Sequence, residues 1–92
     1  MANVDTVLEE RGARYGKFKN HAAIAQGYKL LTASFLEELN KPELSPSQQE
    51  ALDMIFHKIG RIINGDPNYA DSWVDIAGYA KLVADELEGK IK

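Results

Sequence analysis

The sequence contains no cysteine, which excludes disulfide scaffolds, thiolate zinc sites and cysteine nucleophiles. Its uninterrupted apolar runs are only a few residues long, so we expect no segment that spans a bilayer. Residues 1–5 lack the basic and apolar regions of a secretory signal peptide. Strand-like alternation, internal repeats and glycine-rich nucleotide-binding motifs are also missing. These absences predict a soluble, cytoplasmic, helical protein.

Size and charge limit the classes of partner. The 92 residues, 45% hydrophobic and 27% charged, predict one folded domain over residues 1–92. A chain this short buries only about 60–65% of its unfolded surface, so self-association is expected. The net charge of −3 argues against a general nucleic-acid coat. Every charged residue from Arg11 to Phe35 is nevertheless basic, which suits a phosphate-bearing partner or a head-to-tail contact between subunits.

The pattern predicts an all-α bundle of one short and three long helices. The short helix is expected over residues 4–13 and the first long one over 20–39, where Gly27 indicates a close approach of another backbone. The next long helix begins at a capping box, residues 45–48, and ends at residues 64–67, read as a left-handed glycine cap followed by proline. The last covers about 69–88.

Each long segment carries one apolar stripe that is expected to face the core. The three alanines of the last stripe are expected to let a neighbouring helix approach closely. The stripes consist of Ile24, Tyr28, Leu31, Phe35 and Leu39 in the first long segment, of Leu52, Ile55, Phe56, Ile59, Ile62 and Ile63 in the second, and of Trp73, Ile76, Ala77, Ala80, Val83, Ala84 and Leu87 in the third.

Acidic residues lie opposite the apolar stripes of the last two helices. Glu50 and Asp53 are three residues apart and share one face of the first of them. Asp71 and Asp75 are four residues apart on the other. A hairpin of these helices would place four oxygen donors around a hard cation, and Mg²⁺ prefers carboxylates together with waters and phosphates. The pattern therefore predicts a magnesium site; its alternative is the solvated side of ordinary amphipathic helices.

Asp75 is the carboxylate for which a partner is most expected. Val74 and Leu82 place apolar groups on its side of the helix, which indicates that this side is covered. A covered carboxylate needs a partner, and Lys58, Arg61 or a metal ion would supply one.

A basic stretch near the N-terminus is the candidate for gripping phosphates. Its positive residues are interleaved with Tyr15 and Phe18, an arrangement that suits phosphate binding with stacking of a base. The alternative is a connector whose rings plug the end of the bundle while the charges stay in water. His57, a single unspecific histidine, is expected to be structural, either facing solvent or hydrogen-bonded. The basic residues are Arg11, Arg14, Lys17 and Lys19.

The chain resembles small helical proteins encoded by tailed phages. The residues that carry the likeness are 50–61, 64–67 and 71–80, which match a helix "E…HK..RI.nGd" followed by a helix "DSw.DiagYa". Residues 10–18 match the opening "eRg..YG.F" of the same group. The resemblance covers nearly the whole chain and implies a phage protein that acts in the cytoplasm of a bacterial host.

More distantly, the chain is similar to the MazG-like all-α nucleoside triphosphate pyrophosphatases. Those enzymes hold magnesium on acidic pairs of adjacent helices, and the metal bridges the triphosphate for attack by water. The sequence departs from their EExxE and ExxD spacing, because Glu37-Glu38 is followed by Leu-Asn-Lys and Asp71 and Asp75 are one residue too far apart. The departure bears on catalysis more than on fold or nucleotide binding. The resemblance implies catalytic and metal-binding roles for Glu50, Asp53 and Asp75, and a metal-binding role for Asp71. It also implies phosphate contacts for Lys58 and Arg61. Arg14 and Lys17 of the basic stretch are further candidates for phosphate binding.

Two functions of different classes follow. The first is a nucleotide-handling domain that either binds a (deoxy)nucleoside triphosphate with Mg²⁺ or also hydrolyses it to monophosphate and pyrophosphate. The second is a non-enzymatic phage accessory protein that binds a host protein or sequesters a nucleotide signal. Both are expected to form a homo-oligomer that completes the bundle, and neither involves a membrane.

Overall fold

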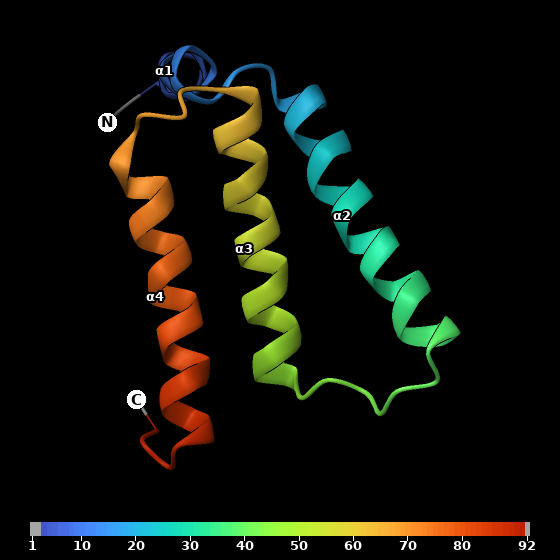
Figure 1. The fold of residues 1–92 in the computed structure, drawn as a ribbon. Helices are drawn as coiled ribbons and strands as arrows, with labels where there is room; N and C mark the ends of the chain where they lie inside the picture. Colours follow the sequence, from blue (N-terminus) through green and yellow to red (C-terminus); the bar gives the residue numbers. More distant parts are fainter. Residues whose placement is uncertain (1–2, 92) are drawn as a thin grey trace.

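The computed structural model describes residues 3–91, and within that range it contains four α-helices and no strand (Figure 1). They are α1 (Val4–Tyr15), α2 (Phe18–Glu38), α3 (Pro46–Asn64) and α4 (Ala70–Leu87). The prediction of an all-α chain with one short and three long helices is confirmed. None of the helices in residues 3–91 combines the length and the apolar character that crossing a membrane requires.

The three long helices lie side by side in one layer. Figure 1 shows α3 between α2 and α4, with α1 across the end of the layer where α3 finishes. Helices α2 and α4 both pack on α3, and in the described part of the chain they do not contact each other. The bundle is therefore open. Helix α3 has a neighbour on each of two sides, and within residues 3–91 no second layer of helices covers either face of the layer.

The ends of α3 show what local signals specify. Ser45 Oγ accepts a hydrogen bond from the Gln48 N–H at 3.1 Å, and Gln48 Oε1 accepts one from the Ser45 N–H at 2.9 Å, so the predicted capping box is confirmed. The predicted left-handed cap at the other end is wrong. Gly65 has φ −125° and ψ −134°, outside the left-handed region, and this glycine serves a close contact instead, described below.

The first two helices meet at a shorter turn than the sequence suggested. Helix α1 passes through Gly12 and ends at Tyr15, and α2 begins at Phe18 with Lys17 at the cap position. Asn20, where the sequence predicts this helix to begin as its N-cap, lies inside α2 instead, so that prediction is wrong. The break needs only Gly16, whose φ of 80° lies in the left-handed region that favours glycine.

Little apolar surface is enclosed. Among the described residues, Ala25 and Ala51 are the only buried hydrophobic ones. A Cβ added at Gly27 would meet nothing within 4 Å, so the predicted close approach at that glycine is wrong. Large apolar side chains remain exposed on every helix, among them Leu31, Phe35, Leu39, Ile63, Trp73 and Leu87.

Helix α4 turns a different side toward α3 than its apolar stripe predicted. Ser72 is buried at 3% exposure, and Ile76, Tyr79 and Val83 are half-buried. The alanines of the predicted stripe, with Trp73 and Leu87, are exposed. The side of α4 that contacts α3 lies next to the predicted apolar stripe. The sequence could not predict this, because an apolar stripe shows which side of a helix avoids water but not which element covers it. The exposed alanines are Ala77, Ala80 and Ala84.

Candidate functional site

Two turns far apart in the sequence interlock at one end of the layer. The side-chain amide of Asn64, the last residue of α3, donates to the carbonyls of Tyr15 at 2.9 Å and Lys17 at 2.8 Å. The N–H of Asp66 donates to the Arg14 carbonyl at 2.9 Å. These bonds fix the basic turn between α1 and α2 against the turn between α3 and α4.

Glycines permit this contact from both sides. A Cβ on Gly16 would collide with the carbonyl and the side chain of Asn64. A Cβ on Gly65 would collide with the backbone of Arg14 and Tyr15. From the sequence, residues 64–67 are expected to act only as a local helix end. The structure shows that each glycine also makes room for the other turn, so the two motifs act as one unit.

Arginines and tyrosines stack next to this contact. The Arg61 guanidinium lies 4.2 Å from the centre of the Tyr15 ring, and the Arg14 guanidinium lies 4.4 Å from that of Tyr69. The two tyrosine rings meet edge to face with centroids 6.2 Å apart. Arg14 also donates to the Tyr69 hydroxyl at 3.1 Å. Stacking holds both cations in place while most of their N–H groups remain available to an anion.

A cavity of about 600 Å³ opens beside this stack, between α1, the start of α2 and the last turns of α3. Three cationic side chains line it, together with aromatic and imidazole rings, and no carboxylate is among the lining residues. Three cationic groups on a wall that no carboxylate lines favour an anionic ligand, and Glu10 lines the smaller cavity next to it. The lining consists of Leu8, Arg11, Gly12, Tyr15, Gly16, Lys17, Phe18, His21, His57 and Arg61.

Two histidines form the inner wall of this cavity. His21 Nε2 and His57 Nδ1 are 3.1 Å apart, so one ring donates a hydrogen bond to the other. Burial, followed by the positive charge of Arg61, lowers the pKa of His21. Burial, the adjacent His21 and Arg61 lower the pKa of His57 to about 4. Both rings are therefore neutral at pH 7, and the hydrogen-bonded alternative for His57 is the one found.

His21 is the residue that sequence reasoning missed. It is buried at 5% exposure on the side of α2 that packs against α3, in register with Ala25 and Tyr28. Its ring fits there because α3 has Gly60 opposite, where a Cβ would lie 2.8 Å from His21 Nδ1. The 4-3 spacing with two packed residues was a usable signal, since it places a polar side chain on the packed side of a helix.

The carboxylates proposed for magnesium have separate neighbours. Asp75 forms an ion pair with Lys58 across α3 and α4 at 3.0 Å, so one of its expected partners is found. The expected cover over its side of α4 is wrong within one chain, because Val74 and Leu82 are 64% and 48% exposed. Asp53 accepts a hydrogen bond from Gln49 at 2.9 Å, and Asp71 accepts one from the Tyr69 hydroxyl at 2.9 Å.

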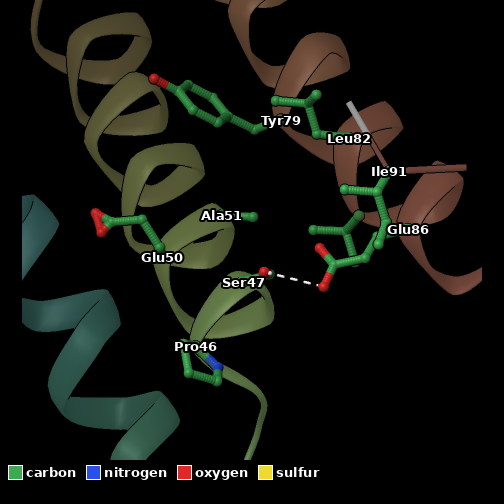
Figure 2. Close-up of a pocket in the computed structure, with 9 residues that line it drawn as sticks. Pro46, Ser47, Glu50, Ala51, Tyr79, Leu82, Glu86 and Ile91 are labelled. Atoms are coloured by element: carbon green, nitrogen blue, oxygen red, sulfur yellow. Dashed lines mark hydrogen bonds between the residues drawn. The ribbon is translucent and has the colours of Figure 1, made fainter.

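Glu50, the fourth proposed ligand, faces a different cavity. It lines a cavity of about 430 Å³ between α3 and α4. Figure 2 shows its carboxylate pointing away from Ser47, which donates to Glu86 at 3.2 Å. In residues 3–91, no three His, Asp or Glu side chains gather as a metal site would require. Within one chain, the structure therefore does not bring the four predicted ligands together.

The predicted phosphate-binding residues divide into two groups. Arg61 and Lys17 line the cationic cavity, and Arg14 lines a cavity of about 330 Å³ next to it. Lys58 instead lies between α3 and α4 with its side chain 12% exposed, paired with Asp75. Residues of the basic stretch and of the end of α3 thus line one cationic site, which we call the cationic cavity. Lys58 does not belong to it.

Comparison with known proteins adds one relationship. No curated protein and no solved structure matches the chain. The family model described as a domain of unknown function (DUF6378) matches residues 2–87, including both interlocking turns and all of the residues that line the cationic cavity. The chain therefore belongs to the DUF6378 family.

Proposed function

We propose that this protein binds a small phosphorylated ligand of nucleotide size in the cationic cavity. The observation that carries the proposal is the convergence of Arg11, Lys17 and Arg61 on a cavity of about 600 Å³ that no carboxylate lines. Ligand sites for small molecules commonly have volumes of about 300–1,000 Å³. The size and the charge of the cavity both fit a nucleotide.

The cationic side chains suit a group with several negative charges. Arginine binds phosphate oxygens through two parallel N–H groups, and Arg61 is already held by its stacking on Tyr15. The neutral histidine pair adds polar ring atoms to the wall without adding charge. Three positive charges facing one cavity match a diphosphate or triphosphate better than a single carboxylate.

An aromatic ring at the cavity gives a base a place to stack. Phe18 lines the cavity and is 77% exposed, so its ring is accessible to a ligand. Stacking of a base on such a ring is worth about 1–3 kcal/mol and tolerates different bases. The cavity therefore fits nucleotides as a class and does not select among bases.

Hydrolysis remains a separate prediction. Conversion of a triphosphate to monophosphate and pyrophosphate would need Mg²⁺, for which Glu50, Asp53, Asp71 and Asp75 are the candidates from sequence. Their separate neighbours within one chain favour binding over turnover as the proposal. The MazG-like relationship, the phage origin, the cytoplasmic location and a host-protein partner likewise stay predictions from the sequence.

Calorimetric titration with the common ribo- and deoxyribonucleoside triphosphates tests the proposal. We expect binding that weakens with salt and that falls at least about 10-fold in Arg11→Gln, which removes a cavity charge. Lys19→Gln is the matched control, because Lys19 is an exposed cation outside the cavity and its loss should change affinity less than about 2-fold. Absence of binding at millimolar nucleotide, or equal losses in both variants, would refute the site. Pyrophosphate release measured with Mg²⁺ tests hydrolysis independently.

A further inference from the structure

A single copy of the chain exposes more surface than a folded protein of its size. Its accessible surface is 6975 Å², whereas a monomer of 10.2 kDa is expected to expose about 5,300 Å². Its radius of gyration is 15.4 Å, against about 12 Å for a compact domain of this length. Roughly 1,700 Å² per chain is therefore left uncovered relative to an ordinary monomer.

The uncovered apolar side chains lie on one side of the helix layer. A helix turns by about 100° per residue, and the sides of α2 and α4 that contact α3 are known from their buried residues. Helices α2 and α4 run antiparallel to α3 (Figure 1). When the remaining residues of each helix are projected from these contacts, the apolar stripes of all three helices point to the same side of the layer. The ring of Tyr28 on α2 stacks on Phe56 of α3 with centroids 5.7 Å apart, which joins two of the stripes.

We call this side the apolar face. Several of its members are about half exposed, with Leu31 at 56%, Phe35 at 49% and Trp73 at 55%. Helix α3 presents its own stripe between them. The face is formed by Ile24, Tyr28, Leu31 and Phe35 of α2, by Leu52, Phe56, Ile59 and Ile63 of α3, and by Trp73, Ile76, Ala80 and Leu87 of α4.

Charged groups avoid the apolar face. In the same projection every acidic and basic residue of α3 and α4 lies elsewhere, and Lys58 with Asp75 pairs between the two helices. Nucleic acid needs cationic contacts with its phosphates, and interfacial membrane helices carry basic residues beside their apolar side. On α2, Glu38, the last residue of the helix, projects about 20° from Leu31, and the basic residues of that helix lie elsewhere. A face with no basic residue and one acidic residue at its end fits another apolar protein surface.

We infer that a second copy of the chain covers the apolar face, so that two helix layers stack into a dimer. Covering about 1,700 Å² on each chain would bury about 3,400 Å² in total, within the roughly 2,000–5,000 Å² of obligate homodimers. With Ala25 and Ala51 as the buried apolar residues of the described chain, one copy lacks a core of its own. A partner that completes the core must be present whenever the chain folds. A second copy of the same chain meets that condition. Identical faces pair by two-fold symmetry.

The apolar face and the cationic cavity are on opposite sides of α3. His57 and Arg61 project about 160° away from Ile59 and Ile63 at 100° per residue. Pairing through the apolar face would therefore leave the cationic cavity open. The inference does not depend on the proposed function, and either one can fail alone.

Analytical ultracentrifugation of the full chain at about 10 μM tests the inference. The wild type is expected to sediment as a dimer, and Leu31→Glu should raise the dissociation constant at least about 100-fold, because it buries a charge in the interface. Leu30→Glu is the matched control: Leu30 is the adjacent leucine, 74% exposed, and it projects away from the apolar face. It should leave the dimer intact. A monomeric wild type, or a dimer disrupted by Leu30→Glu and not by Leu31→Glu, overturns the inference.

Two measurements on the wild type cover the case in which Leu31→Glu fails to fold. The midpoint of thermal unfolding should rise with protein concentration if folding and pairing are coupled. Trp73, the only tryptophan, lies on the apolar face, so acrylamide should quench its fluorescence more strongly as the protein is diluted. An unfolding midpoint and a quenching constant that do not change with concentration contradict the dimer.

Discussion

Gly60→Ala tests the contact that lets α2 carry a buried histidine. A Cβ at position 60 would lie 2.8 Å from Nδ1 and 2.9 Å from Cε1 of His21, where ordinary contacts begin near 3.4 Å. The imidazole has little freedom to retreat, because its other side is held by His57 at 3.1 Å. Overpacking of this kind costs about 1–3 kcal/mol. The better helix propensity of alanine returns about 0.8–1.0 kcal/mol, so we expect a net destabilisation of about 1 kcal/mol.

The sign should reverse when the ring is removed. In a His21→Ala background the space opposite residue 60 is empty, so Gly60→Ala should stabilise the protein by about 1 kcal/mol through helix propensity alone. The coupling between the two positions would then be about 2 kcal/mol, within the range found for residues in direct contact. Urea unfolding of the four proteins of the cycle, followed by circular dichroism at pH 7.5 and one protein concentration, measures it.

Gly78→Ala provides the control for the propensity term. Gly78 lies inside α4, and a Cβ there would meet nothing within 4 Å, so this change should stabilise the protein by about 1 kcal/mol in either background. If Gly60→Ala stabilises the wild type as much as Gly78→Ala does, the close packing of His21 on α3 is wrong.

Three further predictions concern the interlocked turns, the histidines and the ion pair. Gly65→Ala should destabilise the protein by about 2–3 kcal/mol in urea unfolding, because its Cβ meets the backbone of Arg14 and Tyr15; an unchanged midpoint would contradict the interlock. Stability should fall as the pH drops from about 6.5 toward 4, because the unfolded state takes up the His57 proton in that window and the folded state does not until its pKa of about 4. His57→Gln should reduce the slope in this part of a pH series of unfolding curves, and His21, whose pKa is also lowered, should supply the remainder; a slope as steep as that of the wild type would contradict the assignment. Asp75→Ala should cost about 1 kcal/mol by leaving the Lys58 ammonium, 12% exposed, without its partner; Lys58→Met should cost less in the same assay, and the reverse order would be the contradicting result.

Local signals explain the parts of the fold that the sequence predicts well. The capping box at Ser45 and Gln48 involves groups three residues apart, so spacing alone specifies it. The break after α2 and the lengths of the long helices follow from similar short-range patterns. Gly65 shows where such reasoning stops, because a glycine before Asp-Pro fits a left-handed cap, whereas here it makes room for a backbone about fifty residues away.

The site residues show the same limit in another form. The basic turn was identified from composition, and two of its members line the cationic cavity. The sequence does not indicate the pairing of His21 with His57, because the two residues are 36 positions apart. The four carboxylates share helix faces, but the neighbours that each would meet depend on how α3 and α4 pack. Periodicity places a residue on a side of its helix and does not say which element stands opposite.

The single helix layer connects these observations. A layer has two sides, and here the sides differ: one carries apolar stripes from three helices, and the other carries His57 and Arg61 beside the interlocked turns. In a closed four-helix bundle the stripes would face inward and only the charged sides would remain. Because α2 and α4 both pack on α3 and not on each other, the stripes need a second layer to leave water. A second copy over the apolar face would account for the small buried core of residues 3–91, and it would leave the opposite side available for a charged ligand.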